Sequence, residues 1–236
     1  GRKKRPSLPH LELAKRIPIA PKAGCHQILF HSHYMMVPCL LLDKMMVFDA
    51  KDFTLVSELA FDKGTGPRHG IFDRDHKQFF LVSELTTSFV VQSDRNGPTG
   101  TDSSHNSISL PDFSMKLLQI CPILPLDAVY EEPPASAAIR LSPDQRFLYV
   151  STRFAELITV FKISHGRWSK SSKQGAAASI PATWFLRLTA GTCWWQTAPK
   201  ADWSAFSSTR NRGAPGHMLR VPAPEAVSIV LSQHTI

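Results

Sequence analysis

Short apolar runs alternate with polar turns along the chain. Residues 79–82 (Phe-Phe-Leu-Val) end at Ser83-Glu84, and residues 147–150 (Phe-Leu-Tyr-Val) follow the polar turn Ser-Pro-Asp-Gln at 142–145. Runs of about 4–8 residues rich in aromatic and β-branched side chains predict strands, whereas a helix requires apolar residues at every third or fourth position. Because no useful run of that helical kind is present, the pattern predicts an all-β fold.

The pattern of strand, turn and strand occurs three times. Its copies begin near His26, Arg68 and Ile139, so that 42 residues separate the first two starts and 71 separate the second from the third. A period near forty residues with three or four short strands is typical of a propeller blade. We therefore predict a β-propeller of four-stranded blades. The third strand of each copy is expected at residues 46–49, 88–91 and 158–162.

The longer second interval has a local cause. Residues 93–111 are rich in Ser, Asn, Gly and Pro and show no alternating apolar face. A segment of this length exceeds an ordinary connection between strands. We therefore predict that residues 93–111 form a mobile insertion loop.

The alternation stops between residues 172 and 218, where four tryptophans lie among Thr, Ala and Arg. Back-translation in a shifted frame allows residues 186–197 to spell Ser-Pro-Asp-Gly-Arg-Tyr-Leu-Leu-Val-Ala-Asn, which restores the blade pattern. Our hypothesis is that two compensating frame errors bracket this segment, so we expect no regular blade there in the chain as written. A divergent loop is the alternative interpretation, and sequencing of the genomic DNA decides between the two.

Charge and cysteine content exclude several classes of function. The net charge is +8, but apart from residues 2–5 and the segment 173–218 the Lys and Arg residues are scattered, which disfavours nucleic-acid binding. No apolar run is long enough to span a membrane. The four cysteines show no Cys-x-x-Cys spacing and predict neither a metal site nor a disulfide framework. We expect reduced thiols and a cytoplasmic protein.

Several short motifs carry more specific information. The most specific is Gly-Pro-Arg-His at residues 66–69 with Glu84 after the next strand. The other motifs are His26-Gln27, Asp43-Lys44 with Val47-Phe48, residues 136–139 with 151–153, and residues 221–227. Together they resemble the seven-bladed β-propeller lactonase family, which includes propeller-type bacterial 6-phosphogluconolactonase and fungal carboxymuconate cyclase. The chain departs from the family's usual Leu-Gly at residues 40–42, which are all Leu.

The resemblance implies that about four of seven blades are represented here. We expect residues 1–236 to form a single partial β-propeller domain, with two or three further blades preceding Gly1. The expected blade-like units are residues 20–66, 67–135 and 136–172, the frame-shifted blade 173–218, and a closing strand at 219–236.

The resemblance also implies an active site without a metal or cofactor. His26, Arg68 and Glu84 correspond to the family's catalytic residues, and His69 and Arg153 are expected to bind substrate. Arg, His and Glu suffice to polarise an ester carbonyl, activate water and hold an anion. Purely structural roles remain open: Arg68 and Glu84 as a stabilising ion pair, His26 as a turn or core histidine, and Arg153 as a solvated charge.

The expected function is that of a lactone hydrolase acting on a small anionic sugar lactone such as 6-phosphogluconolactone. Two alternatives remain. A carboxymuconate cycloisomerase needs the same cations and one group that transfers a proton, so the motifs do not separate it from a hydrolase. A non-catalytic or decayed propeller fragment is the second alternative.

Overall fold

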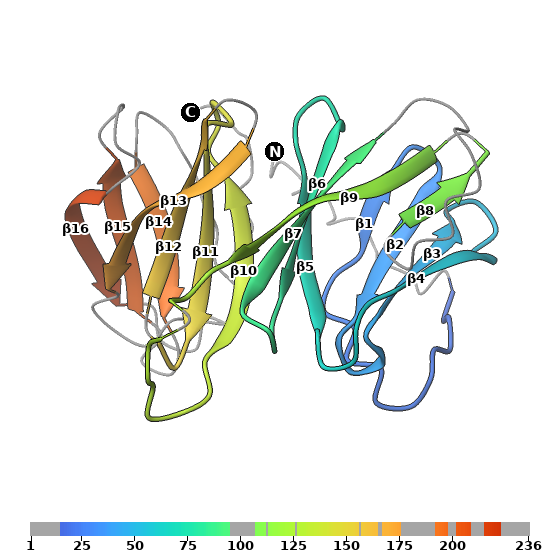
Figure 1. Ribbon diagram of the computed structural model, residues 1–236, viewed down its shortest axis with the longest axis horizontal. Helices are drawn as coiled ribbons and strands as arrows, with labels where there is room; N and C mark the ends of the chain where they lie inside the picture. The colour runs from blue at the N-terminus through green and yellow to red at the C-terminus, as the bar shows by residue number, and fades with distance from the viewer. Residues whose placement is uncertain are drawn as a thin grey trace, which may run out of the picture.

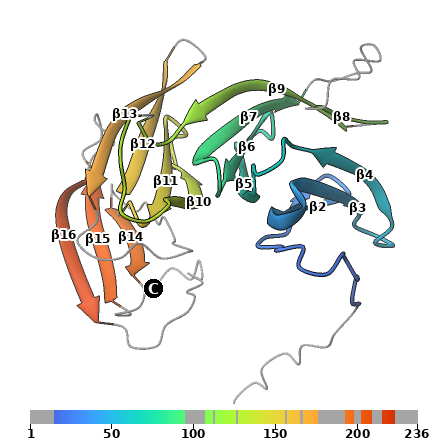
Figure 2. The same cartoon turned by 60° about the horizontal axis from the view of Figure 1, so that its bottom comes forward.

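Four antiparallel sheets make up the described part of the chain (Figure 1). The computed structural model describes residues 15–94 and 107–175, apart from 112, 126, 156 and 165–166, and the backbone of three strands between residues 192 and 222. The sheets follow one another along an arc (Figure 2). The all-β class and the partial β-propeller predicted from the sequence are thus confirmed.

The first three sheets have four, five and four strands. The first contains β1 (Leu29–His31), β2 (Tyr34–Cys39), β3 (Lys44–Asp49) and β4 (Leu55–Ala60), with a 3-10 turn at Leu40–Leu42. The second, in the order β5-β6-β7-β9-β8, contains β5 (Pro67–Phe72), β6 (Gln78–Ser83), β7 (Ser88–Asp94), β8 (Ser107–Leu110) and β9 (Phe113–Pro122). The third contains β10 (Ala135–Leu141), β11 (Phe147–Arg153), β12 (Leu157–Ser164) and β13 (Arg167–Gly175). Strands β5 and β10 face the inside of the arc, and β4, β9 and β13 face its outside (Figure 2).

The predicted third strands of the three copies lie within β3, β7 and β12 and are confirmed. The prediction of a loop over residues 93–111 is wrong at both ends, because residues 93–94 belong to β7 and residues 107–110 form β8. Strand β8 pairs with β9 and buries Ile108 in the core, which gives this short segment the apolar contact that a strand needs. Residues 95–106 lie outside the described part.

Strands also occur within residues 172–218, where no regular blade is expected, but they form a sheet of three strands and not the four of a predicted blade. A fourth sheet contains β14 (Thr192–Thr197), β15 (Asp202–Ser208) and β16 (Pro215–Pro222), in that order. The aromatic and β-branched residues at 192–197 have high strand propensity, and antiparallel pairing requires only the backbone. Any sequence with these properties can pair in this way, so the frame-shift hypothesis stays a prediction.

Strand β6 is buried on both faces and joins the first three sheets into one body. Phe79 and Leu81 pack into a cluster with residues of the first sheet, whereas Phe80 and Val82 pack into a cluster with residues of the third. Each of the four side chains is at most 1% exposed. Burying one such side chain contributes about 1.5–3 kcal/mol, so β6 is a main source of cohesion between neighbouring blades.

The segment before β1 is held against the inner strand β5. The Gln27 side chain accepts a hydrogen bond from the Gly70 N–H (2.7 Å) and donates one to the Gly70 carbonyl (3.2 Å). Gly70 is required for packing, because a Cβ atom at this position would lie 2.5 Å from Cζ of Phe79. These contacts fix the position of the neighbouring His26.

The Asp43 carboxylate connects the first sheet to the loop that precedes β5. Its oxygens accept hydrogen bonds from the Gly64 and Gly66 N–H groups, each 2.8 Å long. Gly66 has a φ of 65°, and its carbonyl accepts a hydrogen bond from the Glu84 N–H (2.8 Å). Asp43 therefore supports the backbone on which Arg68 and Glu84 lie.

No helix in the described ranges has the length and apolar content to cross a membrane.

We predict that Asp43→Ala lowers the free energy of unfolding by about 2–3 kcal/mol, because two amide donors lose a charged acceptor. Asp43→Asn keeps one acceptor oxygen and should cost less. Chemical denaturation of the two variants and the wild-type chain measures both effects. Equal stability of all three would contradict this role of Asp43.

Candidate functional site

The five candidate residues from the sequence analysis come together on the inner side of the arc, where the second and third sheets meet. We call this boundary between the two sheets the inner seam. Arg68 and His69 lie on β5, Glu84 follows the end of β6, and Arg153 ends β11. His26 lies on the segment that Gln27 holds against β5. The structure therefore places all five residues in one cluster, although they are spread over 128 positions of the chain.

The centre of the cluster is the Glu84 carboxylate, which lies between two guanidinium groups. Arg68 Nε is 2.5 Å from Glu84 Oε2, and Arg153 Nη2 donates to Glu84 Oε1 at 2.6 Å. Arg68 is 3% exposed, Glu84 16% and Arg153 24%. Arg153 is thus the arginine of this pair with more access to solvent.

The same residues also join the two sheets. Arg68 Nη1 donates a hydrogen bond to the Ala137 carbonyl on β10 (3.0 Å), and the Ser136 N–H donates to the Glu84 carbonyl (3.2 Å). Because these bonds cross the seam, Arg68 and Glu84 contribute to the packing of the blades in addition to any role in binding. The stabilising ion pair that the sequence left open is therefore present.

His69 lies beside Arg68 and is neutral at physiological pH. It is buried, and Arg68 Nη1 lies 3.2 Å from its Nδ1. Burial, followed by the positive charges of Arg68 and Arg140, lowers the pKa of His69 to about 3. A neutral imidazole here avoids adding another positive charge to a site that already holds several.

His26 packs edge-on against His69, with ring centroids 6.2 Å apart, and is exposed to solvent. Partial burial lowers the pKa of His26 from its ordinary value, and the charge of Arg68 lowers it further against an opposing effect of Glu84. The His26 imidazole is therefore neutral at pH 7. It can accept a proton from a water molecule at the edge of the cluster.

Arg140 is a residue of the site that the sequence analysis missed. It lies on β10, half-buried, and its Nη1 donates to the Ile139 carbonyl (2.7 Å). Burial lowers the pKa of its guanidinium, and its charge acts on His69. A charged residue directly after the buried run at 135–139 of an inner strand is the signal that could have identified it.

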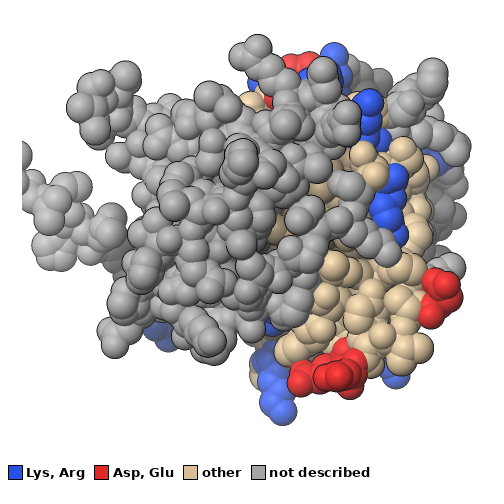
Figure 3. Space-filling view, turned by 90° about the vertical axis from the view of Figure 1, so that its left-hand side faces the viewer, with Lys and Arg blue, Asp and Glu red and all other residues tan. Residues whose placement is uncertain are grey.

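The arrangement suits an anion better than a metal ion. Two guanidinium groups, those of Arg68 and Arg153, face one carboxylate, and the charge of Arg140 acts on the neighbouring His69, so the local charge is positive. Within the described ranges, no group of three or more His, Cys, Asp or Glu side chains could hold a metal ion. On the face shown in Figure 3, the described Lys and Arg side chains lie in several separate places, with acidic side chains near some of them.

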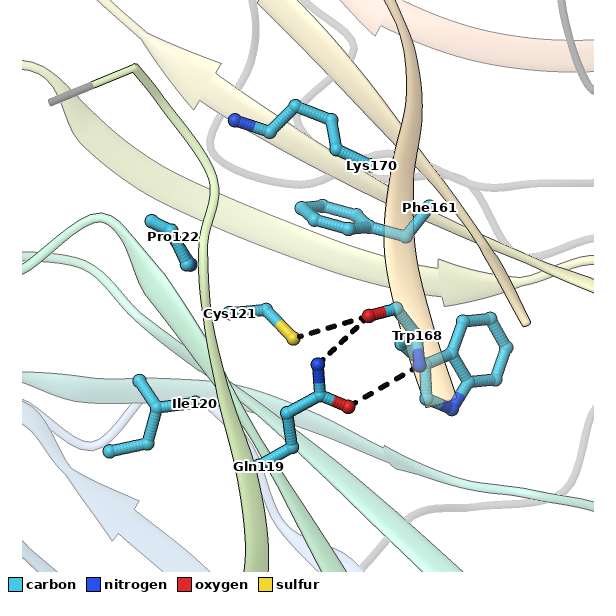
Figure 4. Close-up of a pocket in the computed structure, with 7 residues that line it drawn as sticks. All are labelled: Gln119, Ile120, Cys121, Pro122, Phe161, Trp168 and Lys170. Atoms are coloured by element: carbon cyan, nitrogen blue, oxygen red, sulfur yellow. Dashed lines mark hydrogen bonds between the residues drawn. The ribbon is translucent and has the colours of Figure 1, made fainter. Parts of the chain in front are cut away.

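A recess separate from the inner cluster lies on the outer side of the arc and has a different character. It has a volume of about 300 Å³ and lies between β9 and strands β12 and β13. The Gln119 side-chain amide donates a hydrogen bond to the Trp168 carbonyl (2.9 Å) and accepts one from the Trp168 N–H (3.3 Å), which closes one side of the recess (Figure 4). The recess is lined by Gln119, Ile120, Cys121, Pro122, Phe161, Trp168 and Lys170. With one charged side chain, Lys170, and a Cys121 thiol whose pKa burial raises to about 11, it does not provide the chemistry of the inner cluster.

Comparison with known proteins relates this site to one family. The sequence model described as Lactonase, 7-bladed beta-propeller, matches residues 18–183, which is more than half of the chain. A 6-phosphogluconolactonase from Enterobacter sp. (strain 638) is 30% identical over 148 residues, which cover 60% of this chain and 40% of that protein. The chain thus spans less than half the length of this curated relative.

Two solved structures show the same fold. A protein from Lactobacillus plantarum is 23% identical, with a TM-score of 0.71 over 86% of this chain and 57% of its own. The periplasmic gluconolactonase of Pseudomonas aeruginosa is 19% identical, with a TM-score of 0.69 over 85% of this chain and 54% of its own. At these identities the two structures support the architecture alone.

We predict that Glu84→Ala destabilises the chain by about 3–5 kcal/mol, because the buried Arg68 loses its counter-charge. Arg153→Ala should cost only about 1–2 kcal/mol, since Arg68 then keeps its partner. Lys44→Ala is the matched control, because it breaks an exposed pair with Glu58 and should cost at most about 1 kcal/mol. Equilibrium unfolding measures all three. A Glu84→Ala loss no greater than that of Lys44→Ala would contradict the role of the cluster in the seam.

Proposed function

The chain belongs to the seven-bladed β-propeller lactonase family, and from this premise we propose that it hydrolyses a sugar lactone such as 6-phosphogluconolactone. The observation that carries the proposal is the positively charged cluster beside an exposed, neutral His26. A lactone with an anionic substituent needs both parts: cations for its charges and a proton acceptor for the attacking water.

In the proposed reaction, His26 accepts a proton from a water molecule as the water oxygen attacks the lactone carbonyl carbon. Negative charge develops on the carbonyl oxygen, and the half-buried guanidinium groups of Arg153 and Arg140 stabilise it or bind the phosphate. The ring C–O bond then breaks, and the protonated His26 returns its proton to the departing ring oxygen. The product is the open-chain hydroxy acid.

We assign Glu84 a positioning role in this scheme. Each of its carboxylate oxygens already faces a guanidinium group, so both oxygens are engaged in holding Arg68 and Arg153. It holds Arg153 in place at the solvent side and Arg68 at the buried side. His69, neutral and buried, supports the Arg68 and His26 side chains that it contacts.

The proposed chemistry requires no metal or cofactor, because the guanidinium groups polarise the carbonyl and His26 transfers the proton. We also propose a cytoplasmic location, since Cys25, Cys39 and Cys121 are free thiols. The proposed partner is a small anionic lactone. Fractionation of the producing cell tests the location.

The function is tested by assaying the purified protein with three substrates: 6-phosphogluconolactone, unphosphorylated gluconolactone and carboxymuconate. Release of acid from the phosphorylated lactone, faster than from the unphosphorylated one, supports the proposal. Conversion of carboxymuconate to its lactone, without hydrolysis of either sugar lactone, would overturn it in favour of the cycloisomerase.

We predict that His26→Gln lowers kcat by about 10²–10⁴-fold, because the water loses its proton acceptor. Since His26 is exposed, the thermal midpoint of unfolding should change little. His33→Gln, at another exposed histidine, is the matched control and should keep wild-type turnover. Steady-state kinetics and thermal melts measure both variants. Full activity of His26→Gln would exclude His26 as the base.

We predict that the acid limb of kcat/KM has its midpoint below pH 6.5, because the reaction needs neutral His26 and its pKa is lowered from that ordinary value. The rate is therefore constant near neutral pH and falls as the pH drops through the lowered pKa. Arg153 contributes to this lowering, so Arg153→Ala should move the midpoint to higher pH. A pH–rate profile of both proteins measures the shift, and a shift to lower pH in the variant would contradict the assignment.

A further inference from the structure

Cys25, which precedes β1, lies beside Cys39 at the end of β2, although 14 positions separate them and their spacing shows no motif. Their Sγ atoms are 3.5 Å apart, and their backbones form an antiparallel bridge. Two further hydrogen bonds hold the strands together at this point: Leu40 N–H to the Gly24 carbonyl (3.2 Å) and Leu41 N–H to the Ala23 carbonyl (3.0 Å).

The backbone geometry already suits a covalent link. Antiparallel partners have Cα atoms about 4.5–5.5 Å apart, within the range of about 4.4–6.8 Å that a disulfide spans. The sulfur atoms need to approach by only about 1.5 Å to reach the bond length. Rotation of the two side chains provides such a distance, so the strands can stay paired.

The two thiols have different surroundings. Cys25 is exposed, whereas Cys39 is fully buried and its Sγ donates to the Val37 carbonyl (3.4 Å). Burial, and then the hydrogen bond with Cys25, raises the pKa of Cys39 to about 12. The exposed Cys25 is therefore the thiol that a soluble oxidant reaches first. The raised pKa makes Cys39 a weak nucleophile toward solutes, so its assigned role is to react with the one sulfur that the fold holds 3.5 Å from it, that of Cys25.

We propose that Cys25 and Cys39 form a reversible thiol–disulfide site whose oxidant is a peroxide. The Cys25 sulfur attacks one peroxide oxygen, the O–O bond breaks, and Cys25 becomes a sulfenic acid with release of water. The Cys39 sulfur then attacks the Cys25 sulfur, the S–S bond forms, and the S–O bond breaks. The departing hydroxide takes the Cys39 proton and leaves as a second water. The two thiols lose two electrons, and these reduce one peroxide to two waters.

The disulfide would attach the start of the segment that carries His26 covalently to the end of β2. Residues 26–28 lie between the bridge Cys25↔Cys39 and the regular pairing that starts at Leu29↔Met36. Gln27 holds the middle of this segment on Gly70. Oxidation would thus restrain the residue next to His26, and any effect on turnover rests on the proposed function.

The test treats the full chain with hydrogen peroxide, alkylates the remaining thiols, and maps the peptides by mass spectrometry without reduction. We expect a linked pair of peptides carrying Cys25 and Cys39, lighter by two hydrogen atoms than the two thiol peptides together and separated again by dithiothreitol. Cys25→Ser, at an exposed position, should abolish the link. Cys121→Ser, which removes another buried thiol, is the matched control and should keep it.

Several outcomes would overturn the proposal. They are the absence of a linked pair, further oxidation of Cys25 to a sulfinic acid without a link, a link to a different cysteine, and loss of the link in Cys121→Ser. Because the mass of the unreduced peptides reports the disulfide itself, this result is independent of the lactone assay. The site can therefore be confirmed or rejected whether or not the chain hydrolyses a lactone.

Discussion

The ion contact between Glu84 and the two arginines is the interaction on which the inner seam depends. Arg68 is buried, and a buried guanidinium without a counter-charge costs several kcal/mol. Glu84 provides that charge and also orients Arg153, which reaches it from the next blade. The same three side chains therefore hold two blades together and create the positive site. A substitution at one of these three side chains that alters the positive site will therefore also alter the packing of the two blades.

Much of the architecture follows from local pattern. The alternation of apolar and polar residues identifies the strands of the first three sheets, and their repetition identifies blades. The candidate residues follow from the resemblance to the lactonase family, and four of them adjoin strands that the pattern identifies: Arg68 and His69 within β5, Glu84 after β6, and Arg153 at the end of β11. Equivalent ends of neighbouring blades meet in space, so the pattern of repeats also predicts which residues converge.

The features that the sequence did not reveal depend on strand pairing and on contacts between sheets. Strand β8 is only four residues long, Ser-Ile-Ser-Leu, and it becomes a strand because β9 pairs with it and its two apolar residues pack against the core. The closeness of Cys25 and Cys39 results from the turn between β1 and β2 and a shift in pairing register, neither of which the spacing of the cysteines shows. Arg140 joins the site only through the stacking of blades. The strands between residues 192 and 222 arise from strand propensity without the turn motifs of the other blades.

The Gln27 contact has a consequence for aggregation. Strand β5 is the edge strand of its sheet, and edge strands expose N–H and C=O groups that can recruit a strand from another molecule. The primary amide of Gln27 offers Gly70 one acceptor and one donor, as a partner strand would, and so occupies this point of the edge with a side chain. Because a side chain cannot propagate a ladder, the inner edge is terminated there, and addition of a foreign strand is blocked.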